Sequence, residues 1–403
     1  MGFPADVKPR FHAVKKQLHI ALYSGSIPST TFIERLIQGL ADRGHSVYLF
    51  GSMQKRTVYG KNVHTYGYRN TRIQKLLYYL KYTLLLSVWK PAAKRKLLRY
   101  LKATGKDSLY ARVKYYPVLW HRPDIFHVQW AKSLPEWMWV QDFGIKLVLS
   151  LRGSHITYSP VGDPNLAAQY RACFPKVDGF HAVSEAMAKE AERYGAAGEK
   201  IRVVYSGLSL EPLPEVTTEH PSVFTMLSVG RPHWVKGYTY ALDACRILKA
   251  KGFRFRYTLI GAAGAIELHY QIKDLGLEEE VLLTAPVPFP EVQRAMEQAD
   301  LLLLPSVEEG IANVVLEAMA LGTPVLTTAC GGMTEVIRDG VNGWVCPIRN
   351  PEAMAKRILE IDAWDDTAKN TLIAQAKATV AAQHRPEAMV QGMEDLYREV
   401  FSF

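Results

Sequence analysis

Two glutamates, Glu309 and Glu317, stand where the chain passes from an apolar run into a helical pattern. The run Asp300–Leu304 predicts a buried strand, and a short loop separates it from a helix expected to begin near Asn313. Backbone N–H groups at a helix start are unpaired and partly positive, which suits the diphosphate of a nucleotide sugar. Glu309 then lies in the loop and Glu317 about two turns further on. The Glu309 carboxylate can accept hydrogen bonds from the sugar, and the Glu317 carboxylate can accept them from the ribose. The alternative is that neither binds a ligand, with Glu309 an exposed acid in a loop and Glu317 an acid on a helix face.

The strands that must position these side chains are short aliphatic and β-branched runs that alternate with helical patterns along the whole chain. This alternation is typical of an α/β fold built on parallel sheets, in which ligands bind at the carboxyl ends of strands. In the first half the predicted strands are His19–Ser24, Ser46–Phe50, Asp124–Val128, Lys146–Leu151, Gly179–Val183 and Ile201–Tyr205. In the second half they are Phe224–Val229, Arg256–Ile260, Val281–Leu283, Asp300–Leu304 and Pro324–Thr328.

The segment Gly207–Pro221 separates the two sets of strands, has three prolines and shows no apolar period, which is typical of an interdomain linker. A chain of 403 residues is long enough for two domains with separate cores. We therefore expect two Rossmann-like domains facing each other across a cleft. The expected bounds are residues 1–206 for the first domain and 207–384 for the second, followed by residues 385–403.

The sequence from Glu309 to Met319 resembles the family 4 glycosyltransferases of the GT-B fold, whose hallmark is two glutamates separated by seven residues in a Glu-Gly-x-x-Asn-Val-x-x-Glu-Ala-Met context. The segment Ser228–Gly237, Ser-Val-Gly-Arg-Pro-His-Trp-Val-Lys-Gly, resembles the family's diphosphate loop. Leu259-Ile260-Gly261 and Ala285-Pro286-Val287 are similar to its nucleotide-base loops, and Gly331–Glu335 to a later turn.

The resemblance implies that residues 1–206 bind the acceptor, that residues 207–384 bind the nucleotide sugar, and that residues 385–403 form a helix that returns to the first domain. It also implies which residues contact the donor and what they do. Arg231 and Lys236 would hold the diphosphate, and two fixed cations can neutralise the charge that grows on the departing nucleotide. Glu309 would orient the sugar without forming a covalent bond. The donor-binding residues carried over are Gly230, Arg231, Lys236, Gly261, Val287, Glu309, Gly310, Ile311, Ala312, Asn313, Val314 and Glu317, and the catalytic ones are Glu309, Arg231 and Lys236.

The acceptor side matches the family less well. Pro28–Ile33, which includes Ser29, resembles the loop that approaches the donor phosphates. Family members often have a histidine after the third predicted strand or in the next strand's loop, where this chain has Gln129 and the run Arg152-Gly153-Ser154-His155. Ser29, Gln129, Arg152 and His155 are therefore candidates for the acceptor or sugar side, whereas His127, inside a strand, is expected to be a core histidine.

The implied activity is retaining transfer of a hexose from a UDP or GDP type sugar to a glycan or lipid-linked acceptor, through an oxocarbenium-like state. No Asp-x-Asp tripeptide occurs in the sequence, so we expect no metal ion and no other cofactor. Two alternatives stay open. One is a nucleotide-sugar epimerase on the same fold, and the other is a non-catalytic nucleic-acid-binding protein.

The nucleic-acid alternative rests on charge. Residues 1–205 hold 32 Lys and Arg against 13 Asp and Glu, a net charge of +19, whereas residues 206–403 hold 17 against 26, a net charge of −9. Such asymmetry suggests an anionic partner for the first half, either a nucleic acid or an acidic membrane, or else a solvated face. No recognisable nucleic-acid-binding motif accompanies the charge, so nucleic acid is not the expected partner.

The segment Thr71–Lys106 combines aliphatic and aromatic bulk with dense Lys and Arg and contains no Asp or Glu. A helix of this kind can lie in the headgroup region of an acidic bilayer, or its apolar part can pack on the sheet with the cations in solvent. No apolar stretch approaches the roughly 20 residues of a membrane span, and the first 18 residues lack the apolar core of a secretory signal. We expect a cytoplasmic protein, peripheral at the inner membrane face.

The four cysteines are widely spaced in the sequence and are expected to be reduced core thiols: Cys173, Cys245, Cys330 and Cys346.

Overall fold

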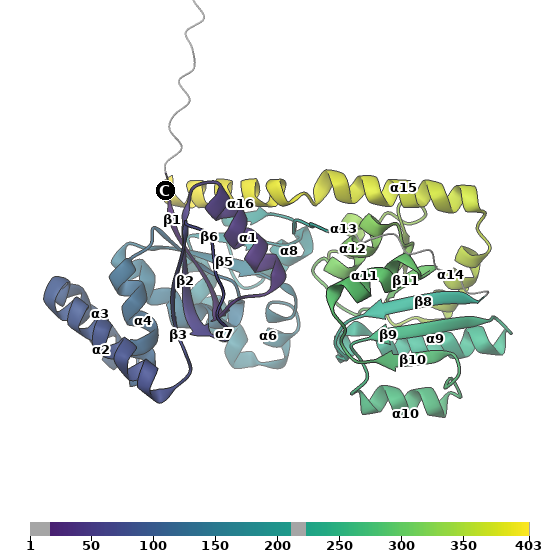
Figure 1. Ribbon diagram of the computed structural model, residues 1–403, viewed down its shortest axis with the longest axis horizontal. Helices are drawn as coiled ribbons and strands as arrows, with labels where there is room; N and C mark the ends of the chain where they lie inside the picture. The colour runs from purple at the N-terminus through teal and green to yellow at the C-terminus, as the bar shows by residue number, and fades with distance from the viewer. Residues whose placement is uncertain (1–16, 211–222, 403) are drawn as a thin grey trace, which may run out of the picture. The chain divides into compact units, whose positions relative to one another are not determined.

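The computed structural model describes residues 17–210 and 223–402 of the chain and contains two parallel β-sheets. The first has seven strands in the order β3-β2-β1-β4-β5-β6-β7, and the second has six in the order β10-β9-β8-β11-β12-β13 (Figure 1). The strands of the first are β1 His19–Ile27, β2 Ser46–Met53, β3 Val63–Tyr68, β4 Ile125–Val128, β5 Lys146–Leu151, β6 Gly179–Ala182 and β7 Ile201–Val203. Those of the second are β8 Phe224–Val229, β9 Phe255–Ile260, β10 Val281–Thr284, β11 Leu301–Leu304, β12 Val325–Thr328 and β13 Trp344–Cys346. The α/β prediction is confirmed.

Two strands, β3 and β13, are absent from the sequence-based prediction. Both lie at sheet edges. Most of β3 is only half-buried, with the sequence Val-His-Thr-Tyr-Gly-Tyr, and β13 has three residues. A central parallel strand is recognised in a sequence by its length and its continuous apolar run. An edge strand has a neighbouring strand on one side only, so it needs neither feature.

Helices connect most of the consecutive parallel strands, although β2 and β3 are joined by a loop. In the first half they are α1 Thr31–Asp42, α2 Arg72–Trp89, α3 Pro91–Ala103, α4 Leu109–His121, α5 Leu134–Trp137, α6 Ser159–Gly162, α7 Pro164–Cys173 and α8 Glu185–Glu192. In the second they are α9 Tyr238–Ala250, α10 Ile266–Asp274, α11 Phe289–Glu297, α12 Asn313–Leu321, α13 Met333–Val336, α14 Pro351–Asp362, α15 Asp366–Gln383 and α16 Pro386–Ser402. None of the helices within the described ranges is long and apolar enough to cross a membrane.

The second sheet is covered on both faces. On β11, Leu301 and Leu303 belong to one apolar core with side chains of α9, α10 and α14. Leu302 and Leu304 belong to the other core, with α11, α12 and α15. Successive side chains of a strand point to opposite faces, so an unbroken run of leucines satisfies both cores at once. The pattern of helices on the two faces can be followed in Figure 1.

The described chain clusters into two compact units. One comprises residues up to His127 together with Trp139–Lys146, and the other comprises Val128–Met138 and everything from Leu147 onward. The division of the chain into domains at residues 206 and 384 stays a prediction. Residues 211–221 of the predicted linker, and residues 1–16, on which the expectation about a secretory signal rests, lie outside the described residues.

The final helix, α16, packs on β6 of the first sheet, as the sequence predicts. A Cβ added to Gly179 of β6 would lie 2.4 Å from Val400 Cγ2, so only glycine leaves room for the helix. Arg202 on β7 also pairs with Glu399 and Asp395 of α16.

The cysteines are all free, as predicted, and three are buried. Cys173, at the end of α7, is only half-buried, so for this residue the core prediction was wrong.

Candidate active site

The loops with the two predicted motifs follow neighbouring strands. Gly230 follows β8 and Pro305 follows β11, and these strands are adjacent in a sheet whose order runs β9-β8-β11-β12. From β8 the chain continues to β9 and β10 on one side, and from β11 it continues to β12 and β13 on the other. The β8–β11 pair is therefore the topological switch point of the sheet. In open α/β sheets the ligand crevice lies at the carboxyl ends of such strands. The topology therefore brings together two segments that are far apart in the sequence.

Backbone contacts hold these loops against each other. The Val307 N–H donates to the Val235 carbonyl at 2.7 Å. Gly237 has φ +65°, and a Cβ on it would lie 2.0 Å from the carbonyl oxygen of Pro305. The Gly332 N–H donates to the Gly310 carbonyl at 2.9 Å, which ties the loop after β12 to the same place. These contacts leave no room for side chains at the crossing points, so glycine is required there.

At the centre, Glu309 accepts two hydrogen bonds through the same oxygen. Lys236 Nζ lies 2.6 Å from Glu309 Oε1, and Ser306 Oγ donates to that oxygen at 2.9 Å. The side chains of Lys236 and Glu309 are 23% and 16% exposed, so the pair is half-buried. The position of Ser306 is fixed in turn, because its carbonyl accepts a hydrogen bond from Thr328 Oγ1. Glu309 is thus a carboxylate of fixed orientation whose Oε2 accepts no hydrogen bond from a described residue.

The other predicted donor-side residues lie in the loops after β8, β9, β10 and β11 and on α12. Arg231 is exposed and makes no ion pair with any described residue. The helix α12 begins at Asn313 without a side-chain cap and without an acid in its first turn, so its first N–H groups are open to an anion. Glu317 is half-buried on α12. Gly261 lies against the loop after β8, where a Cβ would be 3.0 Å from the Gly230 carbonyl oxygen. Val287, Ile311, Ala312 and Val314 pack on the apolar core, and a Cβ on Gly310 would lie 3.0 Å from Val183 Cγ2.

Sequence reasoning missed three groups here: Tyr238, Glu308 and Ser306. The Tyr238 phenol is buried at the start of α9, and burial followed by the Glu309 charge raises its pKa, so the hydroxyl stays protonated. The pKa of Glu308 is also raised, first by burial and then by Glu190 and Glu309. Ser306, three residues before Glu309, and Tyr238, directly after Gly237, were visible in the sequence as polar groups beside the motifs. What was not visible is that strand order would turn them toward Glu309.

On the predicted acceptor side, three of the four candidates lie close together. Gln129, after β4, is fully buried; its Oε1 accepts from Arg152 Nη2 at 3.3 Å, and its Nε2 has no hydrogen-bond partner among the described residues. Burial lowers the pKa of Arg152 to about 10. His155 packs on the Trp130 ring at 5.3 Å, and burial, followed by Lys132, lowers its pKa to about 4, so it is neutral at pH 7. Ser29 follows β1 in the other compact unit. His127 is buried within β4, as predicted for a core histidine.

Further contacts join the two sets of loops within the larger unit. The Tyr158 ring, after β5, lies 5.1 Å from Trp234 and 5.8 Å from His233. Glu335 accepts hydrogen bonds from the Glu185 and Ala186 N–H groups, each at 2.9 Å, at the start of α8. A carboxylate at a helix N-terminus is favourable because it meets unpaired N–H groups and the positive end of the dipole. The turn Gly331–Glu335 thus connects the loop after β12 to α8.

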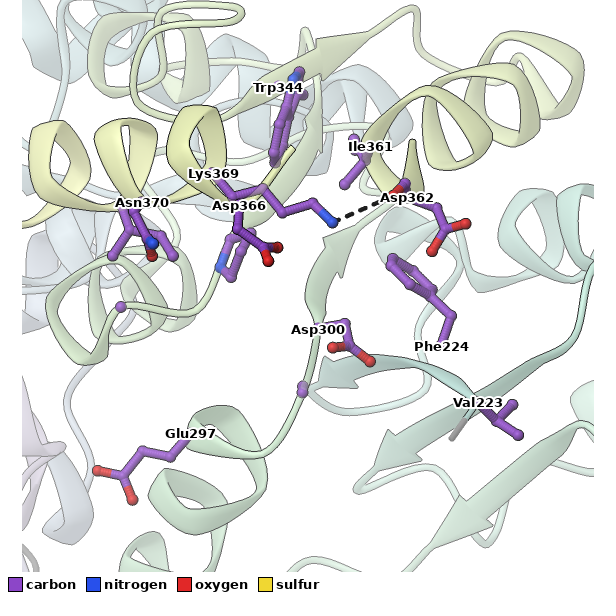
Figure 2. Close-up of a pocket in the computed structure, with 14 residues that line it drawn as sticks. Val223, Phe224, Glu297, Asp300, Trp344, Ile361, Asp362, Asp366, Lys369 and Asn370 are labelled. Atoms are coloured by element: carbon purple, nitrogen blue, oxygen red, sulfur yellow. Dashed lines mark hydrogen bonds between the residues drawn. The ribbon is translucent and has the colours of Figure 1, made fainter. Parts of the chain in front are cut away.

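A cavity of about 700 Å³ in the second half is not part of this site. Figure 2 shows it lined by Phe224, Asp300, Trp344 and Lys369, and the Lys369 ammonium donates to the Asp362 carbonyl at 3.3 Å. Val223, Phe224 and Asp300 stand at the amino ends of β8 and β11. The cavity therefore opens at the edge of the sheet opposite the loops that contain Lys236 and Glu309.

Two family models match the sequence. The model described as Glycosyltransferase Family 4 matches residues 29–212, and that described as Glycosyl transferases group 1 matches residues 223–362. The fold is similar to that of the Thermosynechococcus elongatus sucrose-phosphate synthase (TM-score 0.72, 18% identity, 95% of this chain and 99% of that one). It is also similar to Anabaena HepE in complex with UDP-glucose (TM-score 0.66, 18% identity, 96% and 100%). Both halves of the chain thus match glycosyltransferase models, and the fold is of the GT-B type.

Curated relatives narrow the comparison. The colanic acid biosynthesis glycosyltransferase WcaL of Salmonella typhimurium is 30% identical over 58% of this chain and 59% of its own length. The amylovoran biosynthesis glycosyltransferase AmsK of Erwinia amylovora is 35% identical over 45% and 47%. The chain thus spans about half the length of the curated relatives it matches. These findings give no support to the epimerase and nucleic-acid-binding alternatives.

Proposed function

We propose that the protein is a retaining hexosyltransferase that moves a sugar from a UDP or GDP type nucleotide sugar to a glycan or lipid-linked acceptor. The observation that supports this most directly is the meeting of Lys236, Glu309 and the open start of α12 at the switch point of the second sheet. A cation, a fixed carboxylate and a helix N-terminus are the groups that a diphosphate joined to a sugar requires. HepE has been crystallised with UDP and with UDP-glucose, and the named relatives belong to polysaccharide biosynthesis, which supports this donor and acceptor class.

In the proposed reaction, Arg231, Lys236 and the first N–H groups of α12 hold the diphosphate and stabilise the charge that develops as the sugar bond breaks. An ammonium has three donors, so Lys236 can keep its bond to Glu309 while it donates to a phosphate oxygen. Glu309 Oε2 accepts from sugar hydroxyls, and Glu317 accepts from the ribose. The acceptor hydroxyl then attacks from the face that the nucleotide leaves. Gln129, Arg152 and His155 are the acceptor-side candidates of the larger unit, and Ser29 is the candidate of the smaller one.

Metal independence is part of this proposal, since the two cations occupy the place that a divalent ion would otherwise take. Action in the cytoplasm, where nucleotide sugars would be met, is part of it too. The resemblance to family 4 and the geometry around Glu309 support the role proposed for each residue.

The test is to incubate the protein with a panel of UDP and GDP sugars and to measure nucleotide release with and without glycan acceptors. Release that depends on acceptor supports transfer. Isomerised nucleotide sugar without release would indicate an epimerase, and no turnover or binding of any nucleotide sugar would contradict the proposal. A thermal-shift comparison of UDP with GDP identifies the base, because a ligand that binds the native state raises its melting temperature.

A further inference from the structure

The helix α2 has an apolar face that no described residue of its compact unit covers. Ile73 is 73% exposed, Leu77 61%, Leu84 65% and Val88 61%, and Leu76 and Leu80 are about half exposed. Their three- and four-residue spacing places all six on one side of the helix, about a third of its circumference. On the opposite side only Tyr82 and Leu86 are buried. The sheet-packing alternative that the sequence left open is therefore wrong for most of this helix, and a continuous apolar face exposed to water indicates an interaction surface.

The next helix, α3, supplies positive charge beside that face. Ala92, Arg95, Arg99 and Lys102 fall on one side of α3 and, with Leu98, line a groove of about 550 Å³. The whole segment Thr71–Lys106 contains no Asp or Glu. Charge of one sign concentrated beside an apolar face favours a partner that is both apolar and anionic.

A side-chain contact shows that the two features adjoin. Ser87 stands three residues after Leu84, on the apolar side of α2, and its hydroxyl accepts from Lys94 Nζ of α3 at 2.6 Å. The first turn of α3 therefore lies beside the end of the apolar face. Figure 1 shows α2 and α3 together in dark blue with α4 next to them, and α4 packs on both α2 and β2. We define the α2–α3 surface as the exposed residues Ile73, Leu76, Leu77, Leu80, Leu84 and Val88 with Arg95, Arg99 and Lys102.

We propose that the α2–α3 surface docks on an anionic lipid bilayer. Leucine, isoleucine and valine side chains gain free energy when they enter the boundary between headgroups and acyl chains, and arginine and lysine beside them pair with lipid phosphates. A nucleic acid would use the cations but leave the leucines in water. A second copy of the chain, meeting this surface by two-fold symmetry, would bring cations against cations. The inference does not depend on the proposed transfer reaction.

The cations of α3 differ in whether their side chains already bind other residues of the protein. Lys96 donates to the Asp142 carbonyl and lies 4.9 Å from the Phe143 ring centre, and Lys94 is bonded to Ser87. Arg95, Arg99 and Lys102 are exposed and form no ion pair with a described residue. The informative variant is therefore the triple reversal R95E/R99E/K102E.

The experiment is co-sedimentation of the full chain with vesicles of phosphatidylcholine alone and of phosphatidylcholine mixed with phosphatidylglycerol. We expect binding to the anionic vesicles only, weakening as salt is added. R95E/R99E/K102E should lower the partition coefficient about a hundredfold or more, and L77S/L80S/L84S should lower it at least about tenfold through lost apolar burial. The matched control K251E/R254E/K273E reverses three exposed cations of the second half and should change binding less than twofold beyond its general effect on net charge.

Circular dichroism melting of each variant establishes that it is folded, which is expected because every changed side chain is exposed. Equal binding to neutral and anionic vesicles, no binding to either, or wild-type binding by both surface variants would overturn the proposal. So would a dimer in sedimentation that L77S/L80S/L84S converts to a monomer, because the surface would then be an interface between copies. Nucleotide release with a water-soluble acceptor, measured without vesicles, tests the transfer reaction separately.

Discussion

Lys236 Nζ lies 2.6 Å from Glu309 Oε1, although the two residues are 73 positions apart in the sequence. The pair joins the loop after β8 to the loop after β11, and both members are proposed to contact the donor. Because Ser306 also donates to the same oxygen, the carboxylate has one orientation before any ligand arrives. Catalytic groups held in position in this way do not have to be ordered during the reaction.

Replacing Glu309 by Gln should lower kcat by about a hundredfold or more, because the amide is a weaker acceptor for sugar hydroxyls and no longer balances Lys236. The fold should be kept, since glutamine has the same shape as glutamate and its amide oxygen can still accept from Lys236 and Ser306. Steady-state kinetics and urea unfolding measure the two effects. Near wild-type turnover by E309Q and by E309A would show that Glu309 does not contact the sugar.

Replacing Glu317 by Ala should act on binding instead. The proposed contact with the ribose is the same in the ground state and the transition state, so its loss should raise KM for the donor about tenfold and leave kcat nearly unchanged. Titration calorimetry with the free nucleoside diphosphate checks this directly. A fall in kcat with unchanged KM would place Glu317 at the reacting sugar.

Transfer should continue in excess chelator. Arg231 and Lys236 are proposed to supply the positive charge at the diphosphate, so EDTA should change the rate less than about twofold, whereas R231A/K236A should lose activity by about a hundredfold or more. The measurement is nucleotide release before and after dialysis against chelator. A complete loss that added magnesium or manganese restores would refute this reading of the diphosphate site.

Gly331→Ala should be far more damaging than Gly340→Ala. Both glycines have positive φ, +50° and +70°, so alanine is strained at either position. A Cβ on Gly331 would also lie 1.7 Å from the Glu309 carbonyl oxygen, whereas one on Gly340 meets nothing within 4 Å. We expect G340A to cost about 1 kcal/mol of stability with activity kept, and G331A to cost more and to lower activity by displacing Glu309. Equal effects of the two changes would mean that the loop after β11 moves to accommodate the new Cβ at position 331.

Acid should destabilise the first sheet partly through His121. Its ring stacks on Tyr66 at 3.5 Å and its Nε2 lies 3.0 Å from the Tyr82 hydroxyl. Burial, followed by Lys81 and Lys90, lowers its pKa to about 4. The unfolded chain binds a proton near pH 6.5, so the contribution of the neutral ring to stability is complete above that pH and is lost as the pH falls toward 4.

Urea unfolding measured between pH 7.5 and pH 5 should therefore show a slope of stability on pH that H121Q reduces. The overall stability of the variant is not the test, since the ring is packed and its loss will cost free energy at every pH. Only the slope of stability on pH reports the protonation of His121. An unchanged slope would mean that His121 titrates in the folded protein as it does in the unfolded chain.

Much of the fold could be predicted from the sequence because it depends on local patterns. The run Leu301–Leu304 identifies a strand buried on both faces, and the loop and helix after it can be recognised without knowledge of any other element. The same holds for α16, which begins at Pro386 within one residue of its expected start. The resemblance to the family 4 glycosyltransferases also rests on short continuous motifs, such as Glu309–Met319. In each case the information lies in residues that are neighbours in the chain.

What only the tertiary structure decided are the contacts between distant segments. That Lys236 bonds to Glu309, that Glu335 caps α8 and that the apolar side of α2 is left uncovered depend on strand order and helix packing. No local pattern encodes these contacts. A glutamate that binds a helix start and one that faces solvent look alike in sequence, and a helix with leucines on one side looks the same whether a sheet or water lies beyond it. The physical reason is that side-chain periodicity fixes which residues share a face, but the neighbour of that face is set by the packing of the whole unit.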